Sequence, residues 1–420
     1  MRSLLLPLLA SLPLVSLAAQ EPDQYMALAK KVLSTTPLID GHNDLPWRIR
    51  EDKSMTRDVE AYDLRKRTPG HTDFDRLRKG MLGGQFWSVY IPGEIKDSGY
   101  ARVQLEQIDI MRRVIEKYPD QLQFCGTALC VRQAFAAGRI GSLIGMEGGH
   151  AIENSLGALR AFFDLGARYM TLTHNVTLDW ADAALDKPTH GGLTKFGEEV
   201  VREMNRLGML VDISHVSPGT MSDALTVTQA PVIFSHSAAR ALSDHPRNVP
   251  DSILRRLPAN GGVVMVPFVT SFISQKSNDD SKEVGRVRAD LKTRFGADTV
   301  AANREFDKWR TTHPEPHVSI KEVADHIDHI KQVAGVDNVG IGGDFDGIDE
   351  TIDGLEDVST YPSVFAELAR RGWTEADLRK LAGENVLRAL EQTERVAARL
   401  QRERPASTKT LRDLDGKVVP

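Results

Sequence analysis

The stretch "MLVDISH" (residues 209–215) is followed, after a segment of helical length, by "PVIFSH" (residues 231–236), and each ends on a histidine. Both are short apolar runs rich in β-branched residues, which is typical of strands buried on both faces of a parallel sheet. Six more runs of this kind lie on either side of them: "TPLIDGH" (36–42), "QFWSVYI" (85–91), "IGSLIGMEG" (140–148), "YMTLTH" (169–174), "GGVVMVPF" (261–268) and "NVGIGGDF" (338–345).

The segments between these runs have helical periodicity. Examples are residues 101–118, 193–208 and 319–335, and the last two close at a glycine, as helices often do. Eight buried strands alternating with helices predict an α/β fold, a (β/α)8 or TIM barrel with insertions. We expect one catalytic domain over residues 20–400, with a polar surface insertion at about 274–318 between the seventh and eighth strands.

Composition narrows the class of partner. The chain has 420 residues, of which 41% are hydrophobic and 26% charged, and this describes an ordinary globular protein with a large core. Its net charge of -5 arises from 53 basic and 58 acidic residues without a long run of either sign. We therefore expect neither nucleic acid nor an anionic membrane as partner, and a small substrate.

The two ends of the sequence carry a targeting prediction. "MRSLLLPLLASLPLVSLAAQ" has one arginine and a leucine-rich stretch broken by two prolines, which predicts a cleaved signal peptide over residues 1–19. No cysteine follows its small residues, and the final "DLDGKVVP" lacks an apolar tail, so we expect no membrane anchor. The expected protein is exported, either periplasmic or secreted, with residues 401–420 as a peripheral tail.

The chain contains two cysteines, Cys125 and Cys130. Export would allow a short-loop disulfide between them, but their spacing fits no metal or redox motif. The sequence leaves open whether they bond or stay free.

The ends of the predicted strands carry the chemistry. In a (β/α)8 barrel these ends converge on one mouth, where barrel enzymes place their active sites. Six of the eight carry an imidazole or a carboxylate: His42 with Asp44, Glu147, His174, His215, His236, and Asp344 with Asp346. The set predicts a metal site. Because it exceeds the ligands of one zinc ion and a carboxylate can bridge two ions, we expect two metals. Nitrogen-rich ligation without thiolate favours zinc, with cobalt, manganese or iron as substitutes.

Four further side chains are interpreted as peripheral to the metals. Asp346 lies in a glycine-flanked loop, where an aspartate often stabilises a turn, and we leave it out of the primary site. His150, just past "EGG", is expected to support a ligand rather than to bind metal. His326 and His329 are three apart on a predicted helix, but that helix lies outside the barrel, so we do not expect them to hold a metal.

Seven motifs, in order, give the chain a resemblance to a known family. They are "DGHNDLPW" (40–47), "GMEGGHAI" (145–152), "TLTHN" (171–175), "DISHVS" (212–217), "PVIFSHSAAR" (231–240), "RNVPD" (247–251) and "GIGGDFDGID" (340–349). Together they resemble the renal, or membrane, dipeptidase family of zinc peptidases over about residues 27 to 395. The resemblance implies a (β/α)8 barrel with two zinc ions per chain, which agrees with the reading above.

The resemblance also implies a role for each matching residue. His42 and Asp44 would bind the first zinc, His215 and His236 the second, and Glu147 would bridge the two. His174 would contact the substrate and steady the oxyanion, and Arg247 would bind the terminal carboxylate of the substrate. Asp344 would shuttle a proton and contact the free amine.

The expected activity is therefore hydrolysis of dipeptides, including L-Xaa-D-Xaa members and β-lactam-like amides, by a homodimer of the family kind. Two alternatives stay open: another metal-dependent amidohydrolase, acting on N-acyl amino acids or lactones, or an inactive metal-binding barrel. Many amidohydrolases begin with His-x-His and use a bridging lysine, whereas this chain has His-Asn-Asp and Glu147. Animal members carry a lipid anchor and several disulfides, and this sequence departs from them in both.

Overall fold

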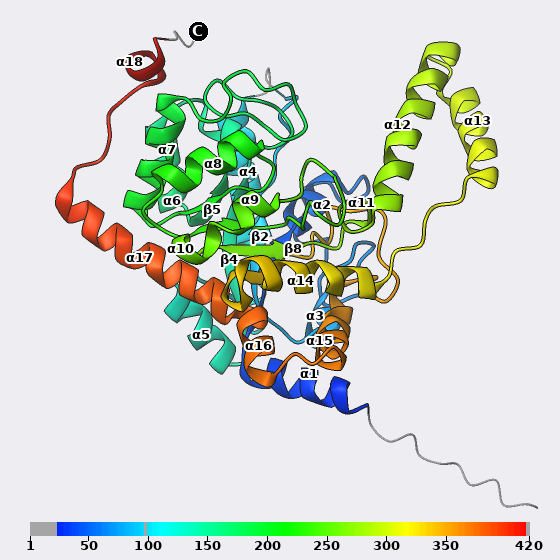
Figure 1. The fold of residues 1–420 in the computed structure, drawn as a ribbon, viewed down its shortest axis with the longest axis horizontal. Helices are drawn as coiled ribbons and strands as arrows, with labels where there is room; N and C mark the ends of the chain where they lie inside the picture. Colours follow the sequence, from blue (N-terminus) through cyan, green and yellow to red (C-terminus); the bar gives the residue numbers. More distant parts are fainter. Residues whose placement is uncertain (1–22, 96–98, 417–420) are drawn as a thin grey trace, which may run out of the picture.

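The computed structural model describes residues 23–95 and 99–416, so the expected signal peptide over residues 1–19 lies outside the described residues. Its centre is a closed barrel of eight parallel strands (Figure 1). Neighbours pair in the order β2-β1-β9-β8-β7-β6-β5-β4, and β2–β4 pairing closes the ring. The strands are β1 (Leu38–Asn43), β2 (Leu82–Ser88), β4 (Ile140–Glu147), β5 (Ala167–Thr171), β6 (Leu210–Asp212), β7 (Val232–Phe234), β8 (Val263–Val266) and β9 (Val339–Ile341). Each coincides with one of the eight predicted runs, so the fold class is confirmed.

One strand of the described chain was not predicted. β3 (Leu122–Phe124) pairs with the beginning of β4, where Gln123 faces Gly141, whereas β5 pairs with β4 only from Ile144 onward. β3 therefore extends the sheet beside β4 at the start of that strand without entering the ring. The disulfide between Cys125 and Cys130 follows it directly, and this settles the question that the sequence left open.

Helices surround the barrel and cover its outer face (Figure 1). They are α1 (Gln24–Thr35), α2 (Leu45–Glu51), α3 (Phe74–Lys79), α4 (Tyr100–Lys117), α5 (Ala128–Ala136), α6 (Leu156–Asp164), α7 (Lys195–Leu207), α8 (Pro218–Val227), α9 (Asp251–Leu254), α10 (Leu257–Asn260), α14 (Ile320–Ala334), α15 (Tyr361–Arg370), α16 (Glu375–Arg379) and α17 (Asn385–Glu403). None of the helices in the described ranges combines the length and apolar character needed to cross a membrane.

The helix α7 illustrates how local sequence sets these elements. The Thr194 side chain caps its first turn by accepting a hydrogen bond from the backbone N–H of Gly197. The helix ends at Gly208, whose φ of +89° belongs to the left-handed region that glycine adopts most easily. Its apolar face, including Phe196 and Met204, is fully buried against the barrel layer.

The strands are buried on both faces. All six residues of β1 and all seven of β2 are buried. One apolar cluster joins strand residues such as Ile39, Phe86 and Ile233 to side chains of α5 and α17. Burial of strands on both faces is the usual state of an all-parallel sheet, and it makes the barrel a rigid support for the side chains at its mouth.

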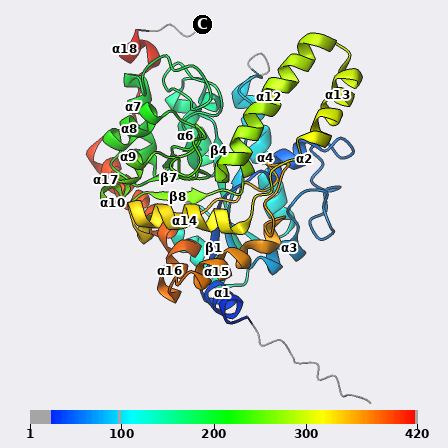
Figure 2. The same cartoon turned by 45° about the vertical axis from the view of Figure 1, so that its right-hand side comes forward.

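Between β8 and β9 the chain makes a helical excursion. α11 (Thr270–Ile273) leads into α12 (Gln275–Phe295) and α13 (Thr299–Thr312), which form a hairpin standing away from the barrel in both views (Figures 1 and 2). α13 has no buried residue, and Arg288 stacks over Phe306 between the two helices. This hairpin occupies the stretch at about residues 274–318 that we expected to be an insertion.

The last described segment folds back onto the helical layer. After α17, a short helix α18 (Leu411–Asp415) lies against α7, with Leu411 buried. Asp415 accepts a hydrogen bond from the backbone N–H of Phe196, and Arg160 donates to the carbonyl oxygen of Ser407. These contacts attach the C-terminal segment to the body of the protein.

Candidate metal centre

The carboxyl ends of the strands bring the predicted ligands into one buried cluster. His42 lies in β1 and Glu147 is the last residue of β4, while His174, His215 and His236 follow the ends of β5, β6 and β7. All of these side chains are at least 85% buried: His42, Asp44, Glu147, His174, His215, His236 and Asp344. The seven side chains selected from sequence as the metal and catalytic set therefore meet at one place.

Close packing inside the barrel permits this approach. A Cβ on Gly41 would lie 2.5 Å from the carbonyl oxygen of Ser235, so a larger residue would push β1 away from the end of β7. With glycine there, the rings of the next residues, His42 and His236, come to 3.9 Å between centroids.

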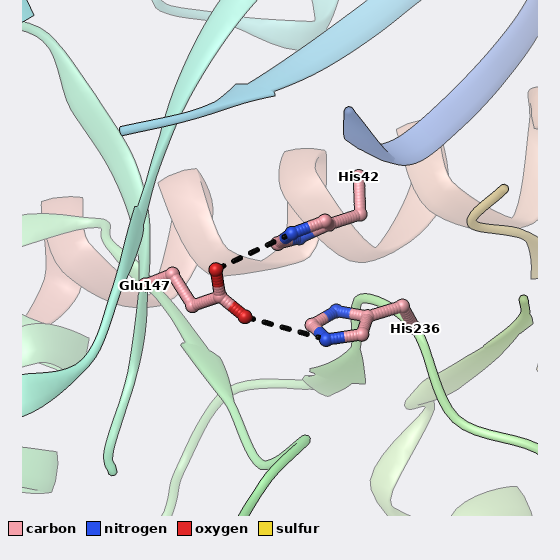
Figure 3. Close-up of side chains that lie close together, drawn as sticks. All are labelled: His42, Glu147 and His236. Carbon is pink, nitrogen blue, oxygen red and sulfur yellow. Dashed lines mark ion pairs between the residues drawn. The ribbon is translucent and has the colours of Figure 1, made fainter. Parts of the chain in front are cut away.

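Glu147 stands at the centre, and its two oxygens face different partners. Oε2 lies 3.5 Å from Nε2 of His42, and Oε1 lies 3.4 Å from Nε2 of His236 (Figure 3). Oε1 also lies 2.8 Å from Nε2 of His215. On the other side, Nε2 of His42 is 3.2 Å from Oδ2 of Asp44. One carboxylate thus separates two sets of donors, which is the arrangement that a bridging ligand requires.

The donors form three compact groups within the described residues. Each group places its ligating atoms within 4.8 Å of one another: His42, Glu147 and His236; Glu147, His174 and His215; and His42, Asp44 and Asp344. Because His42 and Glu147 each belong to two groups, the groups overlap into a single elongated site.

The hydrogen bonds around two of the rings leave lone pairs pointing at each other. Nδ1 of His215 faces Oδ1 of Asn175 at 3.1 Å, and this amide oxygen can only accept, so Nδ1 carries the hydrogen. Nδ1 of His236 faces Oγ of Ser235 at 2.9 Å, and that hydroxyl donates to Asp212. The two Nε2 atoms, 2.9 Å apart, are then both acceptors beside Glu147. A cation satisfies such a set, so the residues fit a metal.

Electrostatics agree with this assignment. Burial lowers the pKa of His215 and His236 well below the usual histidine value, which keeps both rings neutral and able to bind metal. Burial alone would raise the pKa of Glu147, but the charge of His42 outweighs it and holds that pKa well below its usual range. Burial, together with the charges of Asp44 and Glu147, raises the pKa of Asp344 well above normal.

Backbone strain is concentrated at the same place. His215, Asp344 and Asp346 have φ angles of 66°, 64° and 65°, in the left-handed region that residues with a Cβ seldom adopt. Such conformations persist where the surrounding structure demands them, and they gather at functional sites. Here they turn His215 and Asp344 toward the cluster directly after β6 and β9.

The cluster forms the floor of an open cavity of about 470 Å³, which is the size of a small-molecule site. Its walls include Trp47, Tyr90, Arg247 and Phe272. Arg247 is buried, its guanidinium lies 5.0 Å from the centre of the Phe272 ring, and Nη2 donates to the carbonyl oxygen of His236. Burial lowers the pKa of Arg247 to about 10, so it remains a cation at neutral pH.

Several residues of the site were not selected from sequence. Tyr90, just past β2, lies with its ring 4.8 Å from that of His174, and Tyr169 of β5 contacts Nδ1 of His42 at 3.0 Å. Asn175 stands next to His174 in "LTHN", so proximity to a chosen residue was its one signal. The two tyrosines lie in predicted strands, where an aromatic residue indicates core packing more often than function.

The peripheral assignments can be compared with the structure. Nε2 of His150 bonds the carbonyl oxygen of Ile91, and this histidine belongs to none of the three donor groups. Asp346 makes two hydrogen bonds with His71: its Oδ1 accepts from the His71 backbone N–H, and its own backbone N–H donates to Nδ1 of His71. Asp346 thus ties two loops together at the edge of the cavity.

His326 and His329 lie apart from the metal cluster, as expected. Nδ1 of His326 accepts from the backbone N–H of Ala239, and its Nε2 donates to the carbonyl oxygen of Ile273. His329 pairs with Asp251 at 2.8 Å. Each ring is occupied by protein partners.

Comparison with solved structures finds the same fold in dipeptidases. A probable dipeptidase, PvdM, from Pseudomonas aeruginosa is 24% identical with a TM-score of 0.76, covering 90% of this chain and 100% of that one. Dipeptidase AC, a metallopeptidase of family M19, is 26% identical with a TM-score of 0.70, covering 86% and 99%. A metallopeptidase from Rhodobacter sphaeroides, solved with a phosphinate mimic of L-Ala-D-Ala, is 25% identical with a TM-score of 0.69, covering 86% and 99%.

The sequence match reaches over nearly the whole chain. The model of the membrane dipeptidase family, peptidase family M19, matches residues 26–404. That span contains every side chain of the metal cluster and of the cavity wall. With the closed barrel and the donor groups at its mouth, the match identifies this chain as a member of the membrane dipeptidase family, a metal-dependent dipeptidase.

Proposed function

We propose that this protein hydrolyses dipeptides with two zinc ions bridged by Glu147. The observation that carries the proposal is the placement of that carboxylate, whose two oxygens face His42 on one side and His215 with His236 on the other. His42 and Asp44 would hold one ion, and His215 and His236 the other. Two zinc ions in this set would supply a water of lowered pKa and would polarise the scissile carbonyl.

Arg247 is suited to bind the carboxylate of the substrate. It is buried, remains cationic and lines the same cavity as the metal cluster, and its guanidinium lies 5.0 Å from the centre of the Phe272 ring. A planar guanidinium binds a carboxylate through two parallel hydrogen bonds. A free carboxyl terminus one residue beyond the scissile bond would therefore be held at a fixed distance from the metals, which selects dipeptides over longer peptides.

His174 and Asp344 are suited to the charge and proton movements of the reaction. Nε2 of His174 lies 3.8 Å from Glu147, and burial lowers the pKa of this ring, so a neutral imidazole can donate toward the developing oxyanion. Oδ1 of Asp344 lies 3.9 Å from Nε2 of His42 at the cavity floor, where a carboxyl group can deliver a proton to the leaving nitrogen. Its carboxylate form can accept a hydrogen bond from the free amine.

A panel of dipeptides, assayed together with metal content, tests the proposal. We expect turnover that follows two zinc ions per chain and spares tripeptides. Glu147→Gln should lower both zinc content and activity, because an amide cannot bridge two cations as a carboxylate does. Glu199→Gln, in α7 and outside the three donor groups, is the matched control and should change neither. A Glu147→Gln variant with full zinc and full activity would refute the dinuclear proposal.

We further propose that the panel will show cleavage of L-Xaa-D-Xaa dipeptides and of β-lactam-like amides. The Rhodobacter sphaeroides relative, solved with a mimic of L-Ala-D-Ala, supports the first of these. Cleavage confined to L,L-dipeptides would contradict it.

We also propose export, on the strength of the leucine-rich stretch near the N-terminus. N-terminal sequencing of protein recovered from cell fractions would test this, since a mature chain beginning near residue 20 is expected. The homodimer that the family resemblance implies stays a prediction, which light scattering would check.

A further inference from the structure

Behind His236 lies a buried carboxylate that the proposed reaction does not use. Asp212, the last residue of β6, is fully buried and accepts four hydrogen bonds. Its Oδ1 accepts from the backbone N–H groups of Ser214 at 3.0 Å and Ser235 at 2.9 Å. Its Oδ2 accepts from the hydroxyls of Thr171 at 2.5 Å and Ser235 at 2.6 Å. Asp212 therefore ties β5, β6 and β7 together directly beneath the metal cluster.

These contacts set the direction of each hydrogen bond in the series that links Asp212, Ser235 and His236. A carboxylate can only accept, so the single hydroxyl hydrogen of Ser235 points to Asp212. Oγ of Ser235 lies 2.9 Å from Nδ1 of His236 and must then accept from it. With its hydrogen on Nδ1, a neutral His236 presents a lone pair on Nε2, which faces Glu147 and His215.

We propose that Asp212 is a positioning residue that fixes the tautomer of His236 through Ser235, and so makes this ring a metal ligand. The inference rests on the proposed function, since the ligand role is toward the second zinc ion. Outer-sphere partners of metal-bound histidines commonly act in this way, and their loss costs roughly 10- to 100-fold in metal affinity.

The other two ligand histidines are supported differently. His215 faces an amide oxygen of Asn175, which can only accept and so fixes the tautomer in one step. His42 faces the hydroxyl of Tyr169. His236 depends on a hydroxyl that could donate or accept, and Asp212 decides which. The tautomer of His236 is therefore sensitive to a residue that does not touch its ring.

An Asp212→Asn substitution should reverse the donor and acceptor roles in the hydrogen bonds that link this residue, Ser235 and His236. The two backbone N–H groups continue to require an oxygen at the Oδ1 position, which places the new amide nitrogen at the Oδ2 position. From there it donates to the oxygen of Ser235, and the hydroxyl hydrogen of Ser235 turns to Nδ1 of His236. Nδ1 then accepts, Nε2 carries the hydrogen, and the lone pair is lost to the metal.

A Ser235→Ala substitution gives the contrasting result. It removes the contact to Nδ1 but leaves the ring free to keep its hydrogen there, so His236 can still bind metal. We expect Asp212→Asn to weaken binding of the second zinc by roughly 10- to 100-fold. Ser235→Ala should weaken binding of the second zinc less than Asp212→Asn does, although Ser235 contacts the ring of His236 directly. In the double variant the amide has no hydroxyl to turn, so affinity should recover to that of Ser235→Ala.

The experiment is a zinc titration of the full-length protein by chelator competition, with a second readout from nitrogen NMR of histidine-labelled, zinc-depleted protein. The NMR signals of His236 should show the hydrogen on Nδ1 in wild type and on Nε2 in Asp212→Asn. Asp40→Asn is the matched control: Asp40 is a fully buried carboxylate at β1 that accepts from the backbone N–H groups of His42 and Gly343 and touches no ligand ring. It should leave the second zinc and the His236 signals unchanged.

The possible outcomes distinguish a failure of the proposed function from a failure of the proposed role of Asp212. Wild type that binds fewer than two zinc ions would defeat the proposed function, whatever the variants do. The role of Asp212 would be overturned if the wild type binds two zinc ions, while Asp212→Asn binds the second zinc equally tightly and keeps the hydrogen on Nδ1 of His236. Additive losses in the double variant would overturn it as well, because they would indicate a packing role without control of the tautomer.

Discussion

At the scale of single residues, the sequence identified these side chains because imidazoles and carboxylates stand at six of the eight predicted strand ends. His42, Glu147 and His215 could be selected without knowledge of distances. Tyr169 and Asp212 were not selected, because an aromatic residue in a strand indicates core packing and Asp212 stands inside an apolar run that ends on a histidine. Their importance comes from which atoms they face, and that depends on the register between strands.

The proposed binding of the substrate carboxylate by Arg247 is tested by Arg247→Gln, which removes the cation. We expect kcat/KM for free dipeptides to fall by roughly 30- to 1000-fold, because removing one partner of a buried charge pair costs about 2 to 4 kcal/mol. Turnover of the corresponding dipeptide amides should change little. Arg65→Gln, at an exposed arginine that pairs with Asp120, serves as the control. Equal losses of kcat/KM for free dipeptides and for dipeptide amides would show that Arg247 does not bind the substrate carboxylate.

His174 is close enough to Glu147 to belong to a donor group, so its role needs its own test. His174→Gln should lower kcat by roughly 100- to 1000-fold through loss of oxyanion stabilisation. Zinc content, measured on the same sample, should stay at that of the wild type. A loss of one zinc ion would instead make His174 a ligand.

At the scale of elements, the apolar runs located all eight barrel strands but misjudged where they end. The run at 169–174 was expected to be strand throughout, whereas β5 ends at Thr171 and His174 lies in the turn beyond it. The apolar sequence continues beyond the last paired residue of the strand because the turns at the barrel mouth are also buried. β3 was missed for the opposite reason: of its three residues one is buried, which leaves no apolar run to detect.

The attachment of α14 depends on a histidine that must stay neutral. Burial lowers the pKa of His326 to about 4, and its Nδ1 accepts a hydrogen bond from the backbone N–H of Ala239. The unfolded chain binds this proton more tightly, so the stability contributed by neutral His326 is present above pH 6.5 and is lost as pH falls toward 4.

Urea unfolding at pH 7 and pH 5 tests this. Wild type should lose about 2 kcal/mol more between these pH values than His326→Gln, whose side chain does not titrate. His317→Gln, at an exposed histidine, should behave as wild type. An identical pH dependence in the His326 variant would show that this ring does not govern the acid sensitivity.

At the scale of the whole molecule, the metals should hold the barrel mouth together. The cluster gathers three carboxylates and four imidazoles, contributed by segments that span most of the sequence, within one buried volume. With no cation present, the carboxylates repel one another, and the facing lone pairs of His215 and His236 have no partner between them.

Removal of zinc should therefore destabilise the protein. A site filled at a thousand times its Kd contributes about 4 kcal/mol, so chelation should lower Tm markedly and addition of zinc should restore it. Glu147→Gln should show a much smaller shift on chelation, since it begins with less metal. Calorimetry with and without a chelator measures both, and a Tm indifferent to zinc would contradict the account.

The closure of the ring also dictates an order of events in time. β1, which contains His42, pairs with β9 through Asp40 and Ile341, about three hundred residues apart in the chain. A chain emerging from the ribosome or from a translocation channel cannot close this ring until nearly all of it is present, and contacts so distant in sequence form slowly. The first ligand to be synthesised must wait for the last strand, so capture of the metals marks the completion of folding.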